Sequence, residues 1–251
     1  MSETTFPTEI ITLPSEGKCY PTTSPLSKGT LEIKYMTAKE EEILTSQNLI
    51  KKGIVLDKLF ESIVVDKSVN IDDIILGDKN AIMLATRILG YGSQYKFELM
   101  TDDGETEEVS VDLSKVQTKE VDLNKLNPDN RYKFKTPSGT ELEFKILTHG
   151  DEKSIDADVK AMQRLNKNGG SSELTTRYRY MILSVDGKDD TRTITDFINN
   201  RFLTRDTRAF REYIKELTPD IKLEFEYTNP QTGETEVRPI AMGVGFFWPA
   251  E

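Results

Sequence analysis

The sequence contains two copies of one strand-and-helix pattern, and this repeat constrains the fold more than any other feature. Residues 29–37 (Gly-Thr-Leu-Glu-Ile-Lys-Tyr-Met-Thr) return as residues 139–148 (Gly-Thr-Glu-Leu-Glu-Phe-Lys-Ile-Leu-Thr), one residue longer. Each half then closes with Gly-Glu-Thr-Glu, at 104–107 and 233–236. We expect two related units, residues 29–118 and 119–251, behind an extended N-terminal arm at residues 1–28. A duplicated unit without a concentration of reactive side chains favours a building part over a catalyst.

The composition argues against several classes of protein. The chain of 251 residues has 43 acidic and 33 basic residues, and a net charge of −10 repels phosphate backbones, so no nucleic-acid partner is expected. No stretch approaches the roughly 20 apolar residues of a membrane span, and residues 1–5 lack the features of a signal peptide. The single cysteine, Cys19, excludes an internal disulfide and fits a reducing cytosol. With His149 as the only histidine, a four-ligand Cys/His zinc site is also excluded. We predict no cofactor and no metal.

The first half predicts an arm, a strand, several helices and a hairpin. Residues 10–21 form an apolar run broken by Pro and Gly, which indicates an extended segment. Alternation over residues 31–36 predicts a half-buried strand. Thr37 and Glu40 then fit a capping box that opens a helix to about Asn48. Apolar spacing predicts two further helices and a hairpin: 56–64 and 78–89, the second capped by Asp78, and 95–99 with 109–113.

The second half repeats this order. Thr148 and Asp151 take the places of the capping pair, and Asn-Gly-Gly-Ser-Ser at 168–172 indicates a flexible break. The predicted elements are hairpins at 132–135 with 142–146 and at 222–227 with 235–240, and helices at 151–167, 173–184, 194–200 and 206–217. Strands separated by long helical inserts predict an α+β fold.

No arrangement of reactive residues predicts catalysis. His149 follows the capping Thr148, and we expect it in a solvent-exposed turn. Cys19 has Lys18 beside it but no base partner, so a structural role is expected. The acidic runs at 40–42, 102–103 and 189–190 fit a helix start and turns better than a metal site, and no phosphate-binding glycine motif occurs. We predict that the protein is not an enzyme.

Arginine and aromatic residues interleave in the second half, whereas the first half contains only Arg87. This pattern fits a nucleic-acid surface, a set of amphipathic helices with solvated arginine faces, or a protein interface, where Tyr, Phe and Arg are enriched. The acidic net charge favours a protein interface over a nucleic-acid surface. Amphipathic helices with solvated arginine faces remain an equally good explanation. The predicted contact residues here are Arg177, Arg201 and Arg205.

The apolar C-terminal tail, Phe-Phe-Trp-Pro at 246–249, is the second informative segment. Left free it would promote aggregation, so it packs on its own domain or inserts into a partner, and the sequence leaves both alternatives open. Together with the arm it supplies the remaining predicted contact residues: Leu13, Pro14, Tyr20, Phe246, Phe247 and Trp248.

Four segments resemble small baseplate proteins of T4-like contractile-tailed phages. Residues 13–21 (Leu-Pro-Ser-Glu-Gly-Lys-Cys-Tyr-Pro) are similar to the LPS-x-G-x-x-Y opening of that family. The Gly-Thr strand with Thr-Ala-x-Glu-Glu at 29–41, Leu-Gly-Tyr-Gly at 89–92 and the terminal Phe-Phe-Trp-Pro resemble it too. Taken together, the four segments resemble those of the baseplate hub subunit, or hub assembly protein, of those phages. Some relatives carry a Cys-x-x-Cys pair in the next hairpin, but residues 99–104 contain no cysteine, so no metal is carried over.

The resemblance implies a structural component of the contractile-tail baseplate, at or near the central hub, that acts through protein–protein interfaces in tail assembly. Its partners would be other baseplate, hub and tail proteins of the same phage in a large hetero-oligomeric assembly. It would be assembled in the host cytoplasm and end in the virion. The alternative is a tail assembly chaperone absent from the finished particle, and an enzyme is the third hypothesis.

Overall fold

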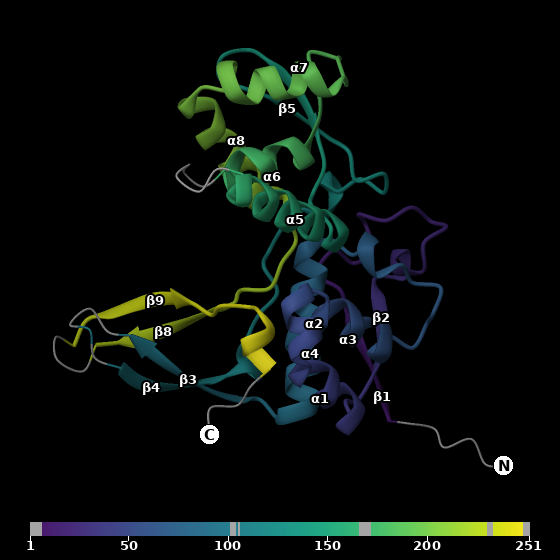
Figure 1. Cartoon of the computed structure of the whole chain (residues 1–251), viewed down its shortest axis with the longest axis vertical. Helices are drawn as coiled ribbons and strands as arrows, with labels where there is room; N and C mark the ends of the chain where they lie inside the picture. The colour runs from purple at the N-terminus through teal and green to yellow at the C-terminus, as the bar shows by residue number, and fades with distance from the viewer. Residues whose placement is uncertain (1–6, 101–103, 105, 166–171, 230–232, 248–251) are drawn as a thin grey trace.

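Helices and short antiparallel sheets are mixed along the whole chain, which confirms the predicted α+β class (Figure 1). The computed structural model describes residues 7–100, 104, 106–165, 172–229 and 233–247. The helices are α1 (Ala38–Thr45), α2 (Gln47–Lys52), α3 (Val55–Ile63), α4 (Leu76–Tyr91), α5 (His149–Leu165), α6 (Glu173–Met181), α7 (Thr191–Asp196) and α8 (Thr204–Leu217). The strands are β1 (Thr8–Thr12), β2 (Thr30–Lys34), β3 (Gln94–Met100), β4 (Thr106–Asp112), β5 (Tyr132–Lys135), β6 (Glu141–Phe144), β7 (Ile182–Val185), β8 (Glu224–Thr228) and β9 (Thr235–Pro239).

The segment predicted as an extended arm is built into the first half. β1 pairs antiparallel with β2 along its full length, with Ile11 opposite Leu31. The chain then turns back through residues 13–28, where Gly17 and Gly29 adopt left-handed backbone conformations. An added Cβ at Gly17 would come within 2.4 Å of a facing backbone oxygen, so only glycine fits. Residues 8–28 are therefore part of the folded first half and not a separate arm.

The capping box at the start of α1 is confirmed. The backbone N–H and the hydroxyl of Thr37 donate to Oε2 of Glu40 at 2.9 and 2.6 Å, and Thr37 Oγ1 accepts from the amide of Lys39. The single helix predicted to about Asn48 is divided into α1 and α2, because Ser46 takes an extended conformation between them. Ser, Thr and Asn compete with the helix for backbone hydrogen bonds, which explains a break in a stretch rich in these residues.

The second half contains a strand that the sequence did not predict. The helix expected over 173–184 ends at Met181, and the next four residues form β7 against β6, so the sheet order is β5-β6-β7. β7 is rich in β-branched residues, and Ile182 and Val185 are both buried against the sheet and helices. After α7 the chain continues through a single π-helical turn at Phe197–Arg201 before α8. The predicted break at 168–172 lies outside the described residues except for Ser172.

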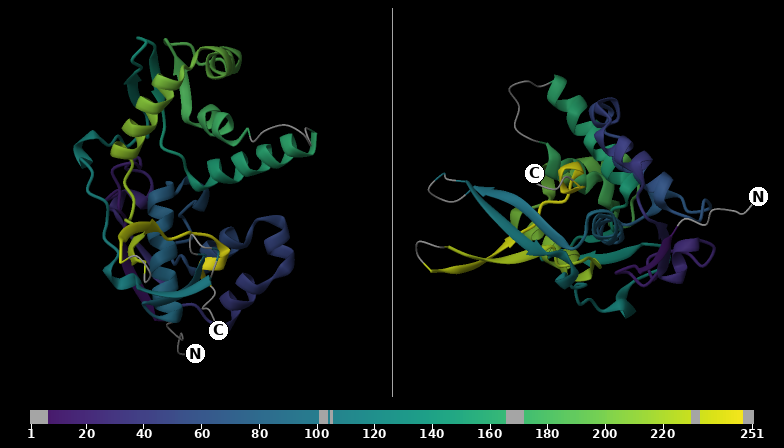
Figure 2. Two further views of the ribbon diagram at one scale, coloured as in Figure 1. Left: turned by 90° about the vertical axis from the view of Figure 1, so that its left-hand side faces the viewer. Right: turned by 90° about the horizontal axis from the view of Figure 1, so that it is seen from below.

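The two long hairpins, one from each half, pack against each other. β3-β4 and β8-β9 project together from the helices in Figure 1 and in the right-hand view of Figure 2. The rings of Phe97 and Phe225 meet edge to face with centroids 5.3 Å apart, and the hydroxyl of Tyr227 donates to Glu107 at 2.8 Å. A hydrophobic cluster beneath them includes Leu113. The closing hairpin of the second half is thus held by the first.

The helical parts of the two halves also share a core. In Figure 1, α5 to α8 lie above α1 to α4, and one cluster of buried residues extends from Leu13 to Phe247. The backbone crosses the junction directly: the amide of Leu76 donates to the carbonyl of Leu147, and the amide of His149 donates to that of Ile74. The division of the chain at residue 118 stays a prediction, and packing on both sides of it is continuous.

Candidate interaction site

The carboxylate of Asp78, in the first turn of α4, holds the loop that contains the first group of predicted contact residues. Its Oδ1 accepts from the amide of Ser15 at 2.9 Å, and its Oδ2 accepts from the hydroxyls of Ser15 and Tyr20 at 2.6 Å each. Burial raises the pKa of Asp78. Leu13, Pro14 and Tyr20 are all buried here. The expectation that they contact a partner is corrected, because they contact their own chain, and Asp78 is not the predicted cap of its helix.

His149 lies inside the molecule and not in the exposed turn that the sequence predicts. Its Nε2 lies 2.5 Å from Oδ1 of Asp57 on α3, and its ring packs edge-on against Phe60. Burial lowers the pKa of His149, so the neutral imidazole is favoured. No local pattern predicts this pair, because its members are 92 residues apart in the chain.

Lys153 balances the acidic side chains around His149. Its ammonium lies 3.2 Å from Oδ2 of Asp57 and 2.8 Å from Oδ1 of Asp72. Ligand atoms of Asp57, Asp72 and His149 lie within 4.8 Å of one another, a grouping that a metal ion can use, but Lys153 already supplies positive charge there. Among the described residues, no hydroxyl or thiol donates to His149, whose Nδ1 has no hydrogen-bond partner. The cluster therefore lacks the nucleophile of a catalytic triad, and it joins α3 to α5.

The arginine and aromatic residues of the second half separate into two layers. Tyr178, Phe202 and Phe210 form an inner cluster with ring centroids 5.2 to 6.0 Å apart, so these rings belong to the core. Arg201 pairs with Asp196 at 3.1 Å and lies over the ring of Phe197, while Arg205 approaches the buried Asp206 at 3.8 Å. These three rings face the core, so they do not contribute to the predicted surface of mixed arginine and aromatic residues.

The apolar tail packs on its own chain as far as the structure describes it. Phe246 and Phe247 are buried, and the ring of Phe246 lies 5.0 Å from that of Tyr95. Of the two alternatives that the sequence leaves open, these two residues therefore pack on their own chain. Trp248 lies outside the described residues.

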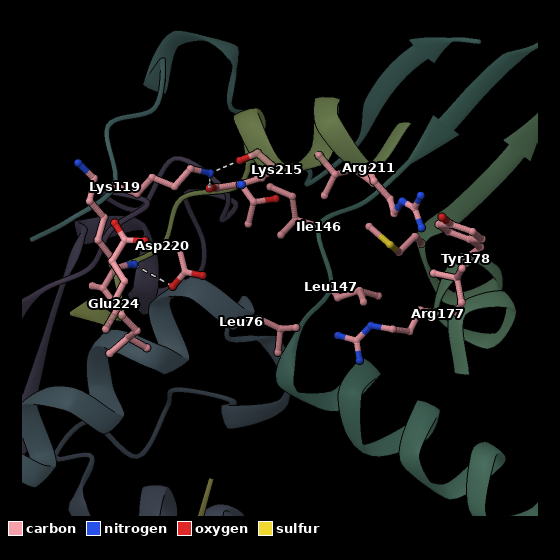
Figure 3. Close-up of a pocket in the computed structure, with 17 residues that line it drawn as sticks. Leu76, Lys119, Ile146, Leu147, Arg177, Tyr178, Arg211, Lys215, Asp220 and Glu224 are labelled. Carbon is pink, nitrogen blue, oxygen red and sulfur yellow. Dashed lines mark hydrogen bonds between the residues drawn. The ribbon is translucent and has the colours of Figure 1, made fainter. Parts of the chain in front are cut away.

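A cleft of about 500 Å³ opens where the two halves meet (Figure 3). It is bounded by α6, α8 and residues 218–224, and Leu76, Ile146 and Leu147 lie along its middle. Arg177 and Arg211 stand at one end of this apolar strip. Of the predicted contact residues, Arg177 is the one that lines this cleft. Arg177 also contacts Glu173, one turn away on α6, at 3.7 Å.

Cations collect at the other end of the cleft as well. Lys119 and Lys215 stand there in Figure 3, opposite the two arginines. The ammonium of Lys119 donates to the backbone carbonyls of Lys215 and Thr218, the latter at 2.9 Å. Burial lowers the pKa of Lys119.

Comparison with known proteins identifies the family. The sequence model of a family described as T4 bacteriophage base plate protein matches residues 7–248. The chain belongs to this family. No curated protein and no solved structure shows a significant match. The match covers both copies of the repeat, the loop at residues 13–28 and the apolar tail as far as residue 248.

Membership in the T4 base plate protein family makes the chain a baseplate protein of a phage tail and supports a structural part in it. None of the described helices is long and apolar enough to cross a membrane. For a baseplate protein the accessible surface is the part that matters for assembly. With the arm residues and Phe246 and Phe247 buried, the cleft at the junction of the halves is the strongest accessible candidate for a contact.

Proposed function

We propose that this protein is a structural component at or near the central hub of a contractile-tail baseplate, where it acts through protein–protein contacts and without catalysis. The single observation that carries the structural role in a baseplate is the family match over residues 7–248. The absence of catalysis is proposed from the sequence, in which no arrangement of reactive residues predicts an active site. The hub position rests on the resemblance of four segments, taken together and in their order along the chain, to the hub subunit or hub assembly protein: residues 13–21, 29–41, 89–92 and 246–249.

The rival within the same family is a chaperone that assists tail assembly and then leaves. Quantitative mass spectrometry of purified particles separates the two, with a major tail protein and a host chaperone as internal references. We expect the chain in purified virions at a fixed ratio to the other baseplate proteins. Its absence from virions, together with its presence in assembly intermediates, would favour the chaperone.

A further inference from the structure

The cleft at the junction of the halves has the wall chemistry of a binding site for an acidic apolar segment. Its volume of about 500 Å³ falls in the range of ligand-binding clefts, about 300–1,000 Å³. The apolar strip along its middle comes from both halves, with Leu76 from α4 and Leu147 from the link between β6 and α5. Leu174 on α6 lines the cleft and is 46% exposed. A partner that inserted an apolar side chain would remove this surface from water.

The charge of the cleft is opposite to that of the molecule. Cationic side chains outnumber carboxylates along its walls by five to two: Lys119, Arg177, Arg211, Lys215 and Lys222 against Asp220 and Glu224. The chain as a whole carries a net charge of −10, so this concentration is local. A cationic cleft on an acidic protein attracts and orients acidic partners.

Most of this positive charge is not neutralised within the chain. In the part of the chain that the structure describes, Arg211, Lys215 and Lys222 form no ion pair with a carboxylate, and all three are exposed. One of the two cleft carboxylates, that of Asp220, already accepts hydrogen bonds from Asn80 Nδ2 at 3.0 Å and from the amide of Ile221 at 2.8 Å. The cations are therefore available to carboxylates from outside.

We propose that the cleft binds a segment of a neighbouring tail protein that inserts apolar side chains over Leu76 and Leu147, while flanking Asp or Glu residues pair with the cations at the two ends. This inference rests on the proposed function, since it takes the partner from the baseplate. The apolar strip distinguishes such a segment from a phosphate backbone, which offers charge without an apolar face. Arginine at one end suits carboxylates because its planar guanidinium can bind them with two hydrogen bonds.

Site-specific photo-crosslinking tests the occupant. A phage lacking the gene is complemented with the protein carrying p-benzoylphenylalanine at position 174, and purified particles are irradiated and analysed by mass spectrometry. We expect a crosslink to an apolar residue of a different tail protein with Asp or Glu within a few positions. The same probe at Leu203, which is 49% exposed and does not line the cleft, is the matched control and should not reach that segment. A crosslink to residues 248–251, to a second copy, to a segment without carboxylates, or to nothing would overturn the proposal.

Charge reversal tests the role of the cations. Arg211→Glu combined with Lys215→Glu should reduce incorporation of the protein into particles by about tenfold while circular dichroism and the melting temperature stay close to those of the parent. Lys39→Glu combined with Lys51→Glu makes the same change of charge at two exposed lysines that do not line the cleft, so this pair is the control and should leave incorporation unchanged. Normal incorporation of the cleft variant would overturn this inference and leave the proposed function standing. Absence of the parent protein from particles would overturn both.

Discussion

Asp206 repeats in the second half the geometry that Asp78 has in the first. The amide and hydroxyl of Ser15 donate to Asp78 at 2.9 and 2.6 Å, and those of Ser138 donate to Asp206 at 3.0 and 2.6 Å. Each aspartate is the third residue of its helix, α4 or α8, and each helix begins without a side-chain cap. Each serine follows a proline in the loop of a two-strand pair. Two identical links at equivalent places support an internal duplication.

Other contacts occur in the same order along both halves. Lys34 bonds the capping Glu40 at 2.8 Å, and Lys145 bonds the capping Asp151 at 2.7 Å. β2 is joined on its second side by an antiparallel bridge at Val64, directly after α3, as β6 is joined by β7 directly after α6. We infer that both halves descend from one plan of strand pair, capped helix, second helix, returning strand, aspartate-bearing helix and long hairpin.

Ser15→Ala and Ser138→Ala should have similar effects if the two links are equivalent. Each change takes one hydroxyl donor from a fully buried carboxylate, Asp78 or Asp206, although Ser15 is buried and Ser138 is exposed. We therefore expect a loss of about 1–2 kcal/mol in the free energy of unfolding for each. Urea unfolding followed by circular dichroism measures it. Ser154→Ala, which removes an exposed hydroxyl that donates to the carbonyl of Gly150, is the control and should change stability by less than about 0.5 kcal/mol. A large loss for one serine and none for the other would contradict the equivalence.

Phe247→Ala should destabilise the isolated protein. The side chain is fully buried in the cluster shared by both halves, and truncating a buried phenylalanine costs about 3–5 kcal/mol. Thermal and urea unfolding of the purified chain measure the loss, with Leu203→Ala at an exposed position as the control. An unchanged midpoint for Phe247→Ala would mean that this residue serves a partner and not the core.

Glu40→Gln should reduce the free energy of unfolding at neutral pH and make that free energy less dependent on pH in the acid range. Burial of Glu40 opposes its ionisation, but hydrogen bonds from Lys34, Ser62 and Thr37 outweigh burial and lower its pKa to about 2. Its contribution is therefore present above the ordinary value of 4.5 and is lost as the pH falls from there toward 2. We expect the variant to be about 2 kcal/mol less stable at pH 7 and to approach the parent near pH 2. Glu42→Gln, on the exposed side of α1, should follow the parent at every pH.

The parent protein should lose stability at mildly acid pH because of His149, and His149→Gln should abolish this loss. Because burial lowers the pKa of His149, the unfolded chain takes up a proton below the ordinary value of 6.5 while the folded protein does not. The free energy of unfolding of the parent should therefore fall as the pH decreases from 6.5 toward the lowered pKa, and the variant should lack this component. Unfolding curves at several pH values between 8 and 5 measure the difference. Equal slopes for the two proteins would show that His149 does not titrate differently on folding.

Local patterns were sufficient to predict the repeated strand, the capping pairs at Thr37 and Thr148, and the hairpins, because each depends on residues close together in the chain. The α+β class followed from their order. β7 was not predicted because a segment of four residues directly after a helix is too short for its hydrophobic periodicity to distinguish a strand from a helix. The arm was misassigned because its burial depends on Asp78, 63 residues from Ser15.

The candidate site could be predicted only in part for the same reason. Arg177 was identified from the interleaving of arginines with aromatic residues, but that pattern could not separate rings that pack inward from charges that face solvent. The cleft forms because Leu76 of the first half lies beside Leu147 and α8 of the second half. No pattern in the sequence predicts that these segments lie next to one another. A pairing between distant segments becomes visible only in the folded chain.

A density map of the intact tail tests the central claim most directly. If the chain is a structural part of the baseplate, density for its α+β fold should lie in the baseplate at or near the central hub, with another protein seated in the cleft beside Arg211 and Leu174. A complete baseplate map in which every density is accounted for by other proteins would contradict the account.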